Sequence, residues 1–358
     1  MERWKTLSRE NPDFWPLLDG SFSQTHVALP VRSLNVGTAS EQVTFEIKSN
    51  EETGTPSALK VIWLLIRPHT LILSLGPMLA TLFFCIARGL VPSGPIAISS
   101  LLGVLLFHVA INLVTDYGDH IKGQDRLRVS GGSRVIQRGW ARAINVKRAA
   151  WACLVAAALC GLPSIVLHFA PVAIVAGLAL LVGLEFAFQK LRLKYRGWAE
   201  IMAFLLTGPF LTSGYAWAIT GSNRLGPQAW LGCVFGAISL MYFHSANFEN
   251  IMTDSQAGIS TWATRTGFES SQKFFYFTSL LTLASTAFFI FAMEKEARLL
   301  PVLLAQALFL VPVSLRVRGL KSPLSSELVG LRSEALRLCL FTSFAFVGGY
   351  LWVIASRI

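Results

Sequence analysis

The sequence predicts an all-α multipass membrane protein. Hydrophobic residues make up 53% of its 358 residues and charged residues only 14%, whereas soluble domains carry about 25% charged residues. Mean hydropathy is +0.54. The same composition excludes disordered, collagen-like and coiled-coil chains, because all three need polar or strictly periodic sequences. A bundle of membrane-spanning helices is therefore the expected architecture.

Apolar stretches long enough to cross about 30 Å of hydrocarbon recur from residue 60 onward. Residues 58–358 are accordingly predicted to form a transmembrane domain in the lipid bilayer. We expect nine spans in it, at residues 69–87, 95–115, 149–168, 170–188, 199–220, 228–247, 274–293, 299–315 and 338–356.

Residues 1–57 are a polar N-terminal extension without a secretory signal pattern. Apolar and polar residues alternate from Val43 to Ile47, which is typical of a strand. The sequence does not identify the partner of this strand. We expect the extension to be a cytoplasmic tail.

The net charge of +11 is explained by the enrichment of Lys and Arg in cytoplasmic loops. It does not predict a nucleic-acid partner. With the N-terminus inside and nine spans, few of the 31 basic residues lie outside. These are Arg88, Arg224, Lys295, Arg298 and Arg357. The sequence therefore predicts a cytoplasmic N-terminus and a C-terminus outside.

A polar cluster, NLVTDYGDHIKGQD from Asn112 to Asp125, closes the second span. Asn112, Asp116 and Asp119 are spaced to share one helical face. Placing a carboxylate at the bilayer centre costs up to about 2.5–3.5 kcal/mol of free energy. A row of such residues at a membrane helix end therefore requires a binding partner. Mg²⁺ prefers oxygen ligands of this kind together with substrate phosphates. A solvated helix end capped by acids is the alternative.

A second cluster, NFENIMTDSQAG, stands at the inner end of the sixth span. On a continuing helix, Asn247, Asn250 and Asp254 would share one face. The two clusters lie at the same ends of two even-numbered spans, so we expect them to converge across the bundle.

Basic segments accompany the clusters. Lys122 follows the first row, and SGGSRVIQRG occupies residues 130–139. Its glycines can bring backbone N–H groups near an anion, and Arg134 can bind phosphate oxygens in bidentate fashion. The enrichment of basic residues in inner loops is the alternative explanation. The segment KLRLKYRGWAE ends at Glu200, which is either a helix-end acid or part of an acceptor pocket.

Together these motifs resemble the UbiA superfamily of membrane prenyltransferases, and most closely its 1,4-dihydroxy-2-naphthoate prenyltransferases of menaquinone synthesis. WLLIRPHTLILSLGP, from Trp63 to Pro77, also resembles the start of that family's first helix. The resemblance covers residues 60–356. It implies a nine-helix transmembrane bundle with cytoplasmic cap loops, Mg²⁺ as cofactor, and two substrates: a polyprenyl diphosphate and an aromatic acceptor.

The resemblance also implies residue roles. Asp116, Asp119 and Asp254 would be the catalytic carboxylates. The implied Mg²⁺ ligands are Asn112, Asp116, Asp119, Asp125, Asn247, Asn250 and Asp254. The implied diphosphate-binding residues are Lys122, Arg134, Lys194 and Arg196, and the implied acceptor-binding residues are Tyr195 and Glu200.

The chain departs from the family pattern in places. Thr115 stands where Asn is usual beside the first Asp. In the second motif, NNxRDxxxD, Ala246, Glu249 and Asn250 replace Asn, Arg and the first Asp. Asn250 keeps an oxygen ligand but removes a negative charge, which predicts weaker metal binding. Glu249 reverses a charge.

The resemblance predicts Mg²⁺-dependent transfer of a polyprenyl group to 1,4-dihydroxy-2-naphthoate in a bacterial inner membrane. Demethylmenaquinone, CO₂ and diphosphate would be the products. One alternative is another aromatic acceptor, such as 4-hydroxybenzoate or homogentisate. The other is a non-catalytic isoprenoid-binding protein with a degenerate second motif.

Overall fold

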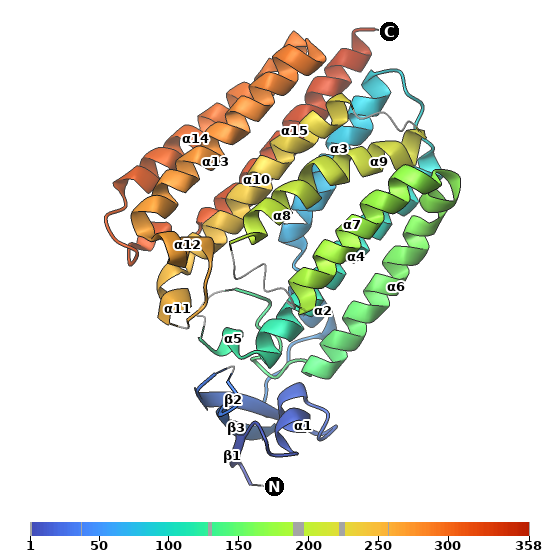
Figure 1. The fold of residues 1–358 in the computed structure, drawn as a ribbon. Coiled ribbons are helices and arrows are strands. Elements are labelled where there is room, and N and C mark those ends of the chain that lie inside the picture. The colour runs from blue at the N-terminus through green and yellow to red at the C-terminus, as the bar shows by residue number, and fades with distance from the viewer. Residues whose placement is uncertain are drawn as a thin grey trace. The chain divides into compact units, whose positions relative to one another are not determined.

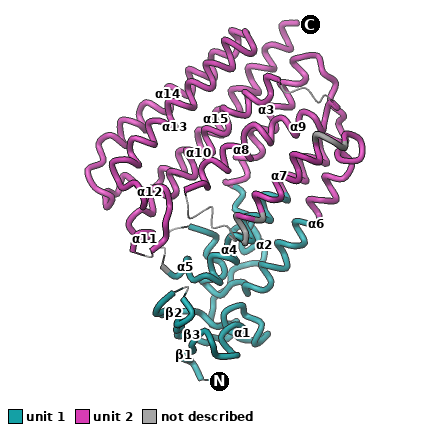
Figure 2. The backbone as a smooth tube through the Cα atoms, viewed as in Figure 1, with its two compact units in different colours: residues 1–68, 106–155 teal, residues 69–105, 156–358 magenta. Residues whose placement is uncertain are grey.

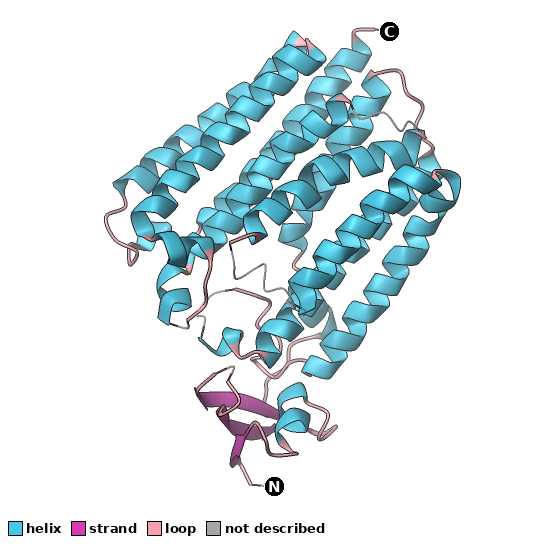
Figure 3. Cartoon of the chain, in the orientation of Figure 1, coloured by secondary structure: helices cyan, strands magenta, loops and turns pink. Residues whose placement is uncertain are grey.

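The structure is a computed structural model that describes residues 2–36, 38–127, 131–188, 197–221, 226–256 and 258–357. Within these residues the chain is mostly helical, with three strands near the N-terminus (Figures 1 and 3). It divides into two compact units, Met1–Pro68 with Leu106–Val155 and His69–Leu105 with Ala156–Ile358 (Figure 2). Two long helices, α4 (Gly94–Ile121) and α6 (Ala143–Leu167), contribute residues to both units.

The first unit begins with an antiparallel sheet in the order β1-β3-β2. Its strands are β1 (Trp4–Ser8), β2 (His26–Leu34) and β3 (Gln42–Ser49). Alternation along β3 places Val43, Phe45 and Ile47 on one face, where they form a small hydrophobic core with helix α1 (Phe14–Asp19). The rings of Phe14 and Phe45 lie 5.9 Å apart, edge to face. The N-terminal extension is therefore a folded segment with its own core.

The strand predicted at residues 43–47 is confirmed as part of β3, but the protein is mostly helical rather than all-α. β1 has only five residues, and the register of β2 against β3 shifts between Pro30 and Arg32. In the sequences of β1 and β2, apolar and polar residues therefore alternate too little to predict a strand. These strands are stabilised by pairing with β3, and strand formation depends on such context more than on intrinsic preference.

The rest of the first unit surrounds the end of α4. It contains α2 (Ala58–Ile66) and α5 (Gln124–Leu127), together with the loop of residues 131–142 and the start of α6. Helix α2 ends at Ile66, and the next residue, Arg67, has a φ of +55°. The following residue is Pro68, which disfavours helical geometry in the residue before it.

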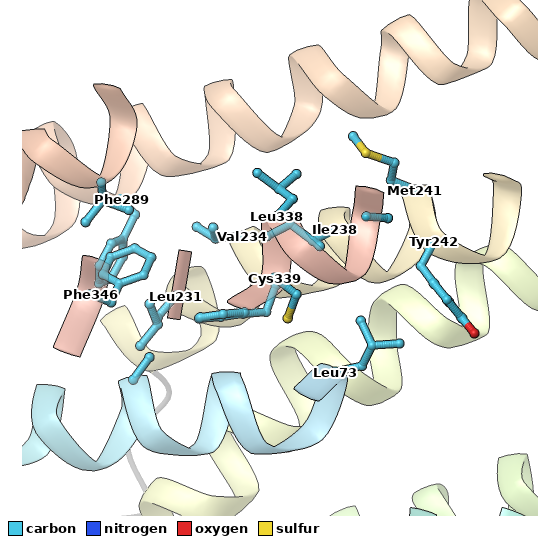
Figure 4. Packing of buried hydrophobic residues seen from close by; sticks show 14 of the residues in the cluster. Leu73, Leu231, Val234, Ile238, Met241, Tyr242, Phe289, Leu338, Cys339 and Phe346 are labelled. Atoms are coloured by element: carbon cyan, nitrogen blue, oxygen red, sulfur yellow. The ribbon is translucent and has the colours of Figure 1, made fainter. Parts of the chain in front are cut away.

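The second unit is a helical bundle around α10. Its helices besides α4 and α6 are α3 (Ile72–Ala87), α7 (Phe169–Phe188), α8 (Ala199–Leu205), α9 (Leu211–Thr220), α10 (Pro227–Glu249), α11 (Ile251–Gln256), α12 (Trp262–Thr266), α13 (Phe268–Phe288), α14 (Leu300–Gly319) and α15 (Leu331–Ala355). Helix α10 packs against α3, α8, α13 and α15. Leu231, Val234 and Ile238 of α10 share one hydrophobic core with Leu338 and Phe346 of α15 (Figure 4).

Glycines allow α8 and the turn after it to approach α10 closely. Residues Leu206–Phe210 form a π-helical turn that contains Pro209. A Cβ atom on Gly208 would lie 2.5 Å from the carbonyl oxygen of Gly232, and one on Gly236 would lie 2.6 Å from that of Phe204. Small residues of this kind let membrane helices pack backbone to backbone. The crossing brings the start of α8 beside the end of α10.

Eight helical segments of the described residues are long and apolar enough to cross a membrane. They are Ala58–Ala87, Gly94–Ile121, Ala143–Leu167, Ala199–Thr220, Pro227–Glu249, Phe268–Glu294, Ala297–Gly319 and Ser326–Ala355. The chain is therefore a multispan membrane protein. The predicted span at residues 170–188 coincides with α7, whose apolar stretch within the described residues, Val172–Gly183, is shorter. The count of nine spans and the cytoplasmic cap loops stay predictions.

Candidate functional site

The first polar cluster lies at the end of α4 and in α5. Helix α4 continues to Ile121, so Asn112, Asp116 and Asp119 lie on one face, as their spacing predicts. These three residues are only 8%, 3% and 6% exposed, and Asp125 in α5 is 6% exposed. Burying a carboxylate is costly unless it is paired or bound to a cation. Hydrogen-bond donors or positive charge near these side chains are therefore expected.

Asp116 is held by a backbone N–H group and by an arginine. The N–H of Ser133 donates to Oδ2 at 3.1 Å, and Nη1 of Arg67 lies 3.9 Å from Oδ1. Within the described residues, no hydrogen-bond donor reaches this buried Oδ1. Gly132 has a φ of +61°, and a Cβ atom on it would lie 3.1 Å from Oδ1. Glycine thus lets the backbone approach, and Oδ1 is the atom that a cation would take.

The loop of residues 131–138 also wraps around Asp125. Gln137 donates from Nε2 to Oδ2 of Asp125 at 2.7 Å, and Arg134 donates from Nη1 to its carbonyl oxygen at 2.8 Å. A Cβ atom on Gly132 would also lie 3.9 Å from Oδ1 of Asp125. Asp116 and Asp125 therefore approach the same point of the loop. Arg134 has a φ of +60°, an uncommon conformation for a residue other than glycine and one that is enriched at functional sites.

Two basic residues lie close to the acids of this cluster in the sequence. Lys122 is half-buried and lies in the turn just after the end of α4, three residues beyond Asp119. The side chain of Arg126 is 6% exposed and forms an ion pair with Glu41. Burial lowers the pKa of the Arg126 guanidinium, and the Glu41 carboxylate opposes that shift. Even so, arginine stays charged in proteins.

Sequence reasoning missed Arg67 as a site residue. Because Arg67 precedes a proline, it leaves the helical conformation, and its side chain lies beside Asp116. The sequence feature that could have indicated its role is the Arg-Pro pair in the WLLIRP segment, because it places a charged residue at the end of an apolar helix. Asn112 contacts the same place, donating from Nδ2 to the carbonyl oxygen of Ile66 at 3.1 Å.

In the second unit, Glu200 and Asn247 contact each other. Asn247 donates from Nδ2 to Oε1 of Glu200 at 2.7 Å. Glu200 is only 2% exposed, and no donor among the described residues reaches its buried Oε2. This burial does not fit a solvated helix-end acid. It leaves one carboxylate oxygen for a ligand, which favours the acceptor-pocket interpretation.

The second cluster is divided between two helices. Helix α10 ends at Glu249, and Asn250, with φ −100° and ψ 12°, separates it from α11. Asn250 donates from Nδ2 to the carbonyl oxygen of Ala246 at 2.8 Å, a local bond that competes with helix continuation. Asp254 in α11 is fully buried. The prediction of one continuous helical face through Asn247 and Asp254 is therefore wrong.

Glu249 has a partner that accounts for its reversed charge. The backbone N–H of Arg332 donates to its Oε1 at 2.8 Å, and Nε of Arg332 lies 3.3 Å from its Oε2. Arg332 is in the first turn of α15, where the unpaired N–H groups and the helix dipole favour a carboxylate. Glu249 thus ties the end of α10 to the start of α15.

Three of the predicted site residues, Lys194, Tyr195 and Arg196, lie outside the described residues. The first cluster belongs to the first unit and the second cluster to the second. Their convergence stays a prediction.

The first cluster fits a Mg²⁺ ion in its chemistry. Within the part of the chain that the structure describes, no three His, Cys, Asp or Glu side chains form a ready-made metal site. Mg²⁺ usually binds one or two carboxylates together with substrate phosphates, and a three-acid cage is not required. Buried carboxylates with an oxygen such as Oδ1 of Asp116 supply the protein's share of such a site.

The fold and this site define a multispan helical membrane protein with a buried, oxygen-rich cluster lined by basic side chains. Residues 74–327 match the UbiA prenyltransferase family. The chain belongs to this family and is a prenyl-transferring enzyme. Comparison with curated proteins gave no match.

Solved structures share the fold. A UbiA homolog from Archaeoglobus fulgidus bound to DMAPP and Mg²⁺ is 18% identical, with a TM-score of 0.57 over 82% of this chain and 98% of that chain. The same homolog bound to GPP and Mg²⁺ is 16% identical, with a TM-score of 0.58 over 82% and 99%. A structure of digeranylgeranylglyceryl phosphate synthase is 16% identical, with a TM-score of 0.56 over 82% and 99%.

Proposed function

We propose that the protein transfers a polyprenyl group from a polyprenyl diphosphate to 1,4-dihydroxy-2-naphthoate in a Mg²⁺-dependent reaction. The observation that carries the proposal is the approach of Asp116 and Asp125 to the loop of Gly132 and Arg134. This arrangement combines oxygen ligands for Mg²⁺ with N–H donors for phosphate oxygens. The motif resemblance, which extends over residues 60–356, supports the naphthoate acceptor.

In the proposed reaction, the bond between the prenyl carbon and the diphosphate oxygen breaks. An electron-rich ring carbon attacks the prenyl carbon, and the acceptor loses its carboxylate as CO₂. The ring keeps both hydroxyl groups, so the immediate product is the quinol form of demethylmenaquinone. Bound Mg²⁺ would neutralise the negative charge of the leaving diphosphate. Its proposed ligands are Asn112, Asp116, Asp119 and Asp125 in the first unit and Asn247, Asn250 and Asp254 in the second.

The chain's own residues bind the diphosphate and keep water away. We assign Lys122 and Arg134 to the diphosphate, together with Lys194 and Arg196, and we add Arg67 because its guanidinium lies beside Asp116. Fixed positive groups stabilise charge as it develops on a leaving group. The apolar helices exclude water, which would otherwise trap an allylic cation.

Glu200 and Tyr195 are the proposed acceptor-binding residues. The amide of Asn247 holds Oε1 of Glu200, so Oε2 faces no protein donor in the described residues and can accept a hydrogen bond from an acceptor hydroxyl. A buried carboxylate of this kind discriminates strongly against a substrate that lacks the hydroxyl, because the acid would stay unpaired.

We further propose that the enzyme lies in a cytoplasmic inner membrane with its N-terminus in the cytoplasm and its C-terminus outside. The distribution of Lys and Arg between the predicted loops supports this orientation.

The reaction is tested with membranes from cells that express the full chain. They receive a polyprenyl diphosphate, Mg²⁺ and one acceptor at a time, and the products are identified by mass spectrometry, with EDTA as control. The acceptors are 1,4-dihydroxy-2-naphthoate, 4-hydroxybenzoate, homogentisate and an isoprenyl glyceryl phosphate, the last because one structural neighbour is digeranylgeranylglyceryl phosphate synthase.

We expect the quinol form of demethylmenaquinone from the naphthoate, detected as the quinone after oxidation by air during extraction, and no product after EDTA. Product from another acceptor alone would overturn the naphthoate assignment. If no acceptor were prenylated by folded protein across several prenyl chain lengths, the catalytic proposal itself would be contradicted, in favour of isoprenoid binding without turnover.

A further inference from the structure

Residues 1–57 lie outside the matched family region of residues 74–327, yet they contact the first polar cluster. Their core, which contains Leu7, Phe14 and Phe45, packs against Ile121 at the end of α4. All these residues belong to the first unit. The N-terminal segment and the acid-bearing segment are therefore parts of one packed structure.

His120, the residue after Asp119, is the first anchor. It is 2% exposed, and its Nε2 lies 2.9 Å from the carbonyl oxygen of Leu18 in α1. A carbonyl oxygen only accepts hydrogen bonds, so Nε2 carries the proton and donates it. This bond holds the last turn of α4 against the N-terminal segment.

Arg126, the residue after Asp125, is the second anchor. Its Nη1 lies 2.9 Å from Oε1 of Glu41 and donates to Oγ of Ser33 at 2.7 Å. The side chain of Glu41 is 1% exposed, and its Oε2 also pairs with Nη1 of Arg9 at 3.1 Å. Removing one partner of such a buried pair leaves an uncompensated charge, which is strongly unfavourable.

The loop that covers Asp116 and Asp125 is held by the same segment at its far end. Trp140 donates from Nε1 to the carbonyl oxygen of Thr53 at 3.2 Å. Gly139 has a φ of +71°, and a Cβ atom on it would lie 3.1 Å from a side-chain carbon of Leu29. Arg142 donates to the carbonyl oxygen of Gln24.

We propose that the N-terminal segment positions the acids of the first polar cluster, with the Glu41–Arg126 pair as its main contact. This proposal rests on the proposed function of that cluster. The carboxylates of Asp116 and Asp125 both approach Gly132 and repel each other when no cation lies between them. Anchors at residues 120 and 126 hold the backbone in place against this repulsion, so less metal binding energy is used to order the site.

The test compares Glu41→Gln with Glu46→Gln in the full-length protein. Glu46 is a matched control because it is also a buried acid of the N-terminal segment, and its partners, Arg3 and Lys48, both lie in that segment. The first readout is the Mg²⁺ concentration that gives half-maximal turnover. The second readout needs no turnover. Hydrogen exchange of the backbone amides of residues 112–127 is followed during a Mg²⁺ titration in the presence of inorganic diphosphate, and the Mg²⁺ concentration at half of the maximal protection is recorded.

We expect Glu41→Gln to raise both Mg²⁺ concentrations about 10-fold, within the 10–100-fold range typical of residues that orient metal ligands. Turnover at saturating Mg²⁺ should stay within about 2-fold, since the ligands themselves are intact. Glu46→Gln should change neither readout. Glu41→Asp, which keeps the charge, should restore part of the loss.

Ser33→Ala is the milder second variant, because it removes one hydrogen bond to Arg126 and keeps the ion pair. It should also raise both Mg²⁺ concentrations, but by less than Glu41→Gln does. If Glu41→Gln does not fold, Ser33→Ala alone tests the positioning role. The double variant Glu41→Gln/Arg126→Gln should be little worse than Arg126→Gln alone in both readouts. The other partner of Glu41, Arg9, lies within the N-terminal segment, so only the contact with Arg126 reaches the cluster.

An unchanged Mg²⁺ requirement in folded Glu41→Gln and Ser33→Ala would overturn the positioning role. The two proposals can fail separately. If the wild-type protein prenylated no acceptor, the proposed function would be contradicted. If Glu41→Gln still raised the Mg²⁺ concentration needed for protection from hydrogen exchange, the positioning role would be supported. If Mg²⁺ and diphosphate failed to protect residues 112–127 in the wild type, both proposals would be contradicted.

Discussion

At the scale of single residues, the chemistry of the first cluster concentrates on Asp116. One of its oxygens accepts the N–H of Ser133, and the other is buried without a donor in the described residues. A Cβ atom on Gly132 would lie 3.1 Å from this second oxygen, so a side chain there would press against it. A carboxylate buried in this way contributes little to the stability of the fold, because its contacts offset only part of the free energy lost when it leaves water. We therefore interpret it as a residue kept for ligand binding.

Asp116→Ala should reduce turnover by about 10²–10³-fold, the loss typical when one group that stabilises developing charge is removed. Expression in the membrane should not change. Asp13→Ala is the matched control, because Asp13 is exposed and pairs only with Lys5 among the described residues. Product formation is measured by mass spectrometry. Normal activity of Asp116→Ala would remove Asp116 from the site.

Glu200→Gln should raise the KM for the aromatic acceptor while leaving the KM for the polyprenyl diphosphate unchanged. The expected increase is about 10-fold or more, since a hydrogen bond to a charged group is worth about 1.5–3 kcal/mol. Initial rates with each substrate varied in turn measure it. Glu269→Gln, at an exposed position of α13, should behave like the wild type. An equal rise in both KM values would contradict a role in acceptor binding.

At the scale of elements, the crossing of α8 and α10 positions Glu200 beside Asn247. The contact depends on Gly208, Gly232 and Gly236, where backbone meets backbone. Lipid-embedded helices gain little from the hydrophobic effect, so close packing of this kind supplies their association.

Gly236→Ala should therefore destabilise the bundle, because the new methyl group would lie 2.6 Å from the carbonyl oxygen of Phe204. Overpacking of this kind costs about 1–3 kcal/mol. Gly161→Ala is the same substitution in helix α6 at a site with nothing within 4 Å, and it should not destabilise. Thermal unfolding in detergent compares the two variants. Equal stability would show that α8 and α10 can move apart without loss of stability.

At the scale of the whole molecule, the number of spans decides on which sides the termini lie. Eight helical segments of the described residues qualify as spans, and α7 is the predicted ninth. An odd number of crossings places the termini on opposite sides of the membrane, and an even number places them on the same side.

Single cysteines at Ser21 and Ser356, both exposed, test this in a variant without the five native cysteines. An impermeant maleimide should label the Ser356→Cys variant in intact cells and the Ser21→Cys variant only after lysis. Retained prenyl transfer in each variant serves as the control. Labelling of both in intact cells, or of neither, would show an even number of crossings and contradict the predicted nine.

Much of the fold could be predicted from the sequence, since each span must bury its backbone polar groups within its own helix and be apolar along its length. The eight qualifying segments overlap the predicted spans for this reason. The sheet order β1-β3-β2 could not be predicted, because pairing joins residues far apart in the chain and local patterns do not record it.

The candidate site divides in the same way. Regular spacing on a helix was enough to predict that Asn112, Asp116 and Asp119 share a face. It failed for Asn247 and Asp254, where the side chain of Asn250 bonds to the backbone and the helix ends.

Composition and periodicity thus sufficed for the membrane-spanning architecture and the polar clusters at helix ends, because solvation by lipid acts on each segment separately. The partners of the buried charges became known from the tertiary structure: Arg67 for Asp116, Asn247 for Glu200, Arg332 for Glu249 and Glu41 for Arg126. Each pair joins distant parts of the chain. A buried charge is stabilised by whichever partner the fold brings near it, and sequence separation says nothing about that distance.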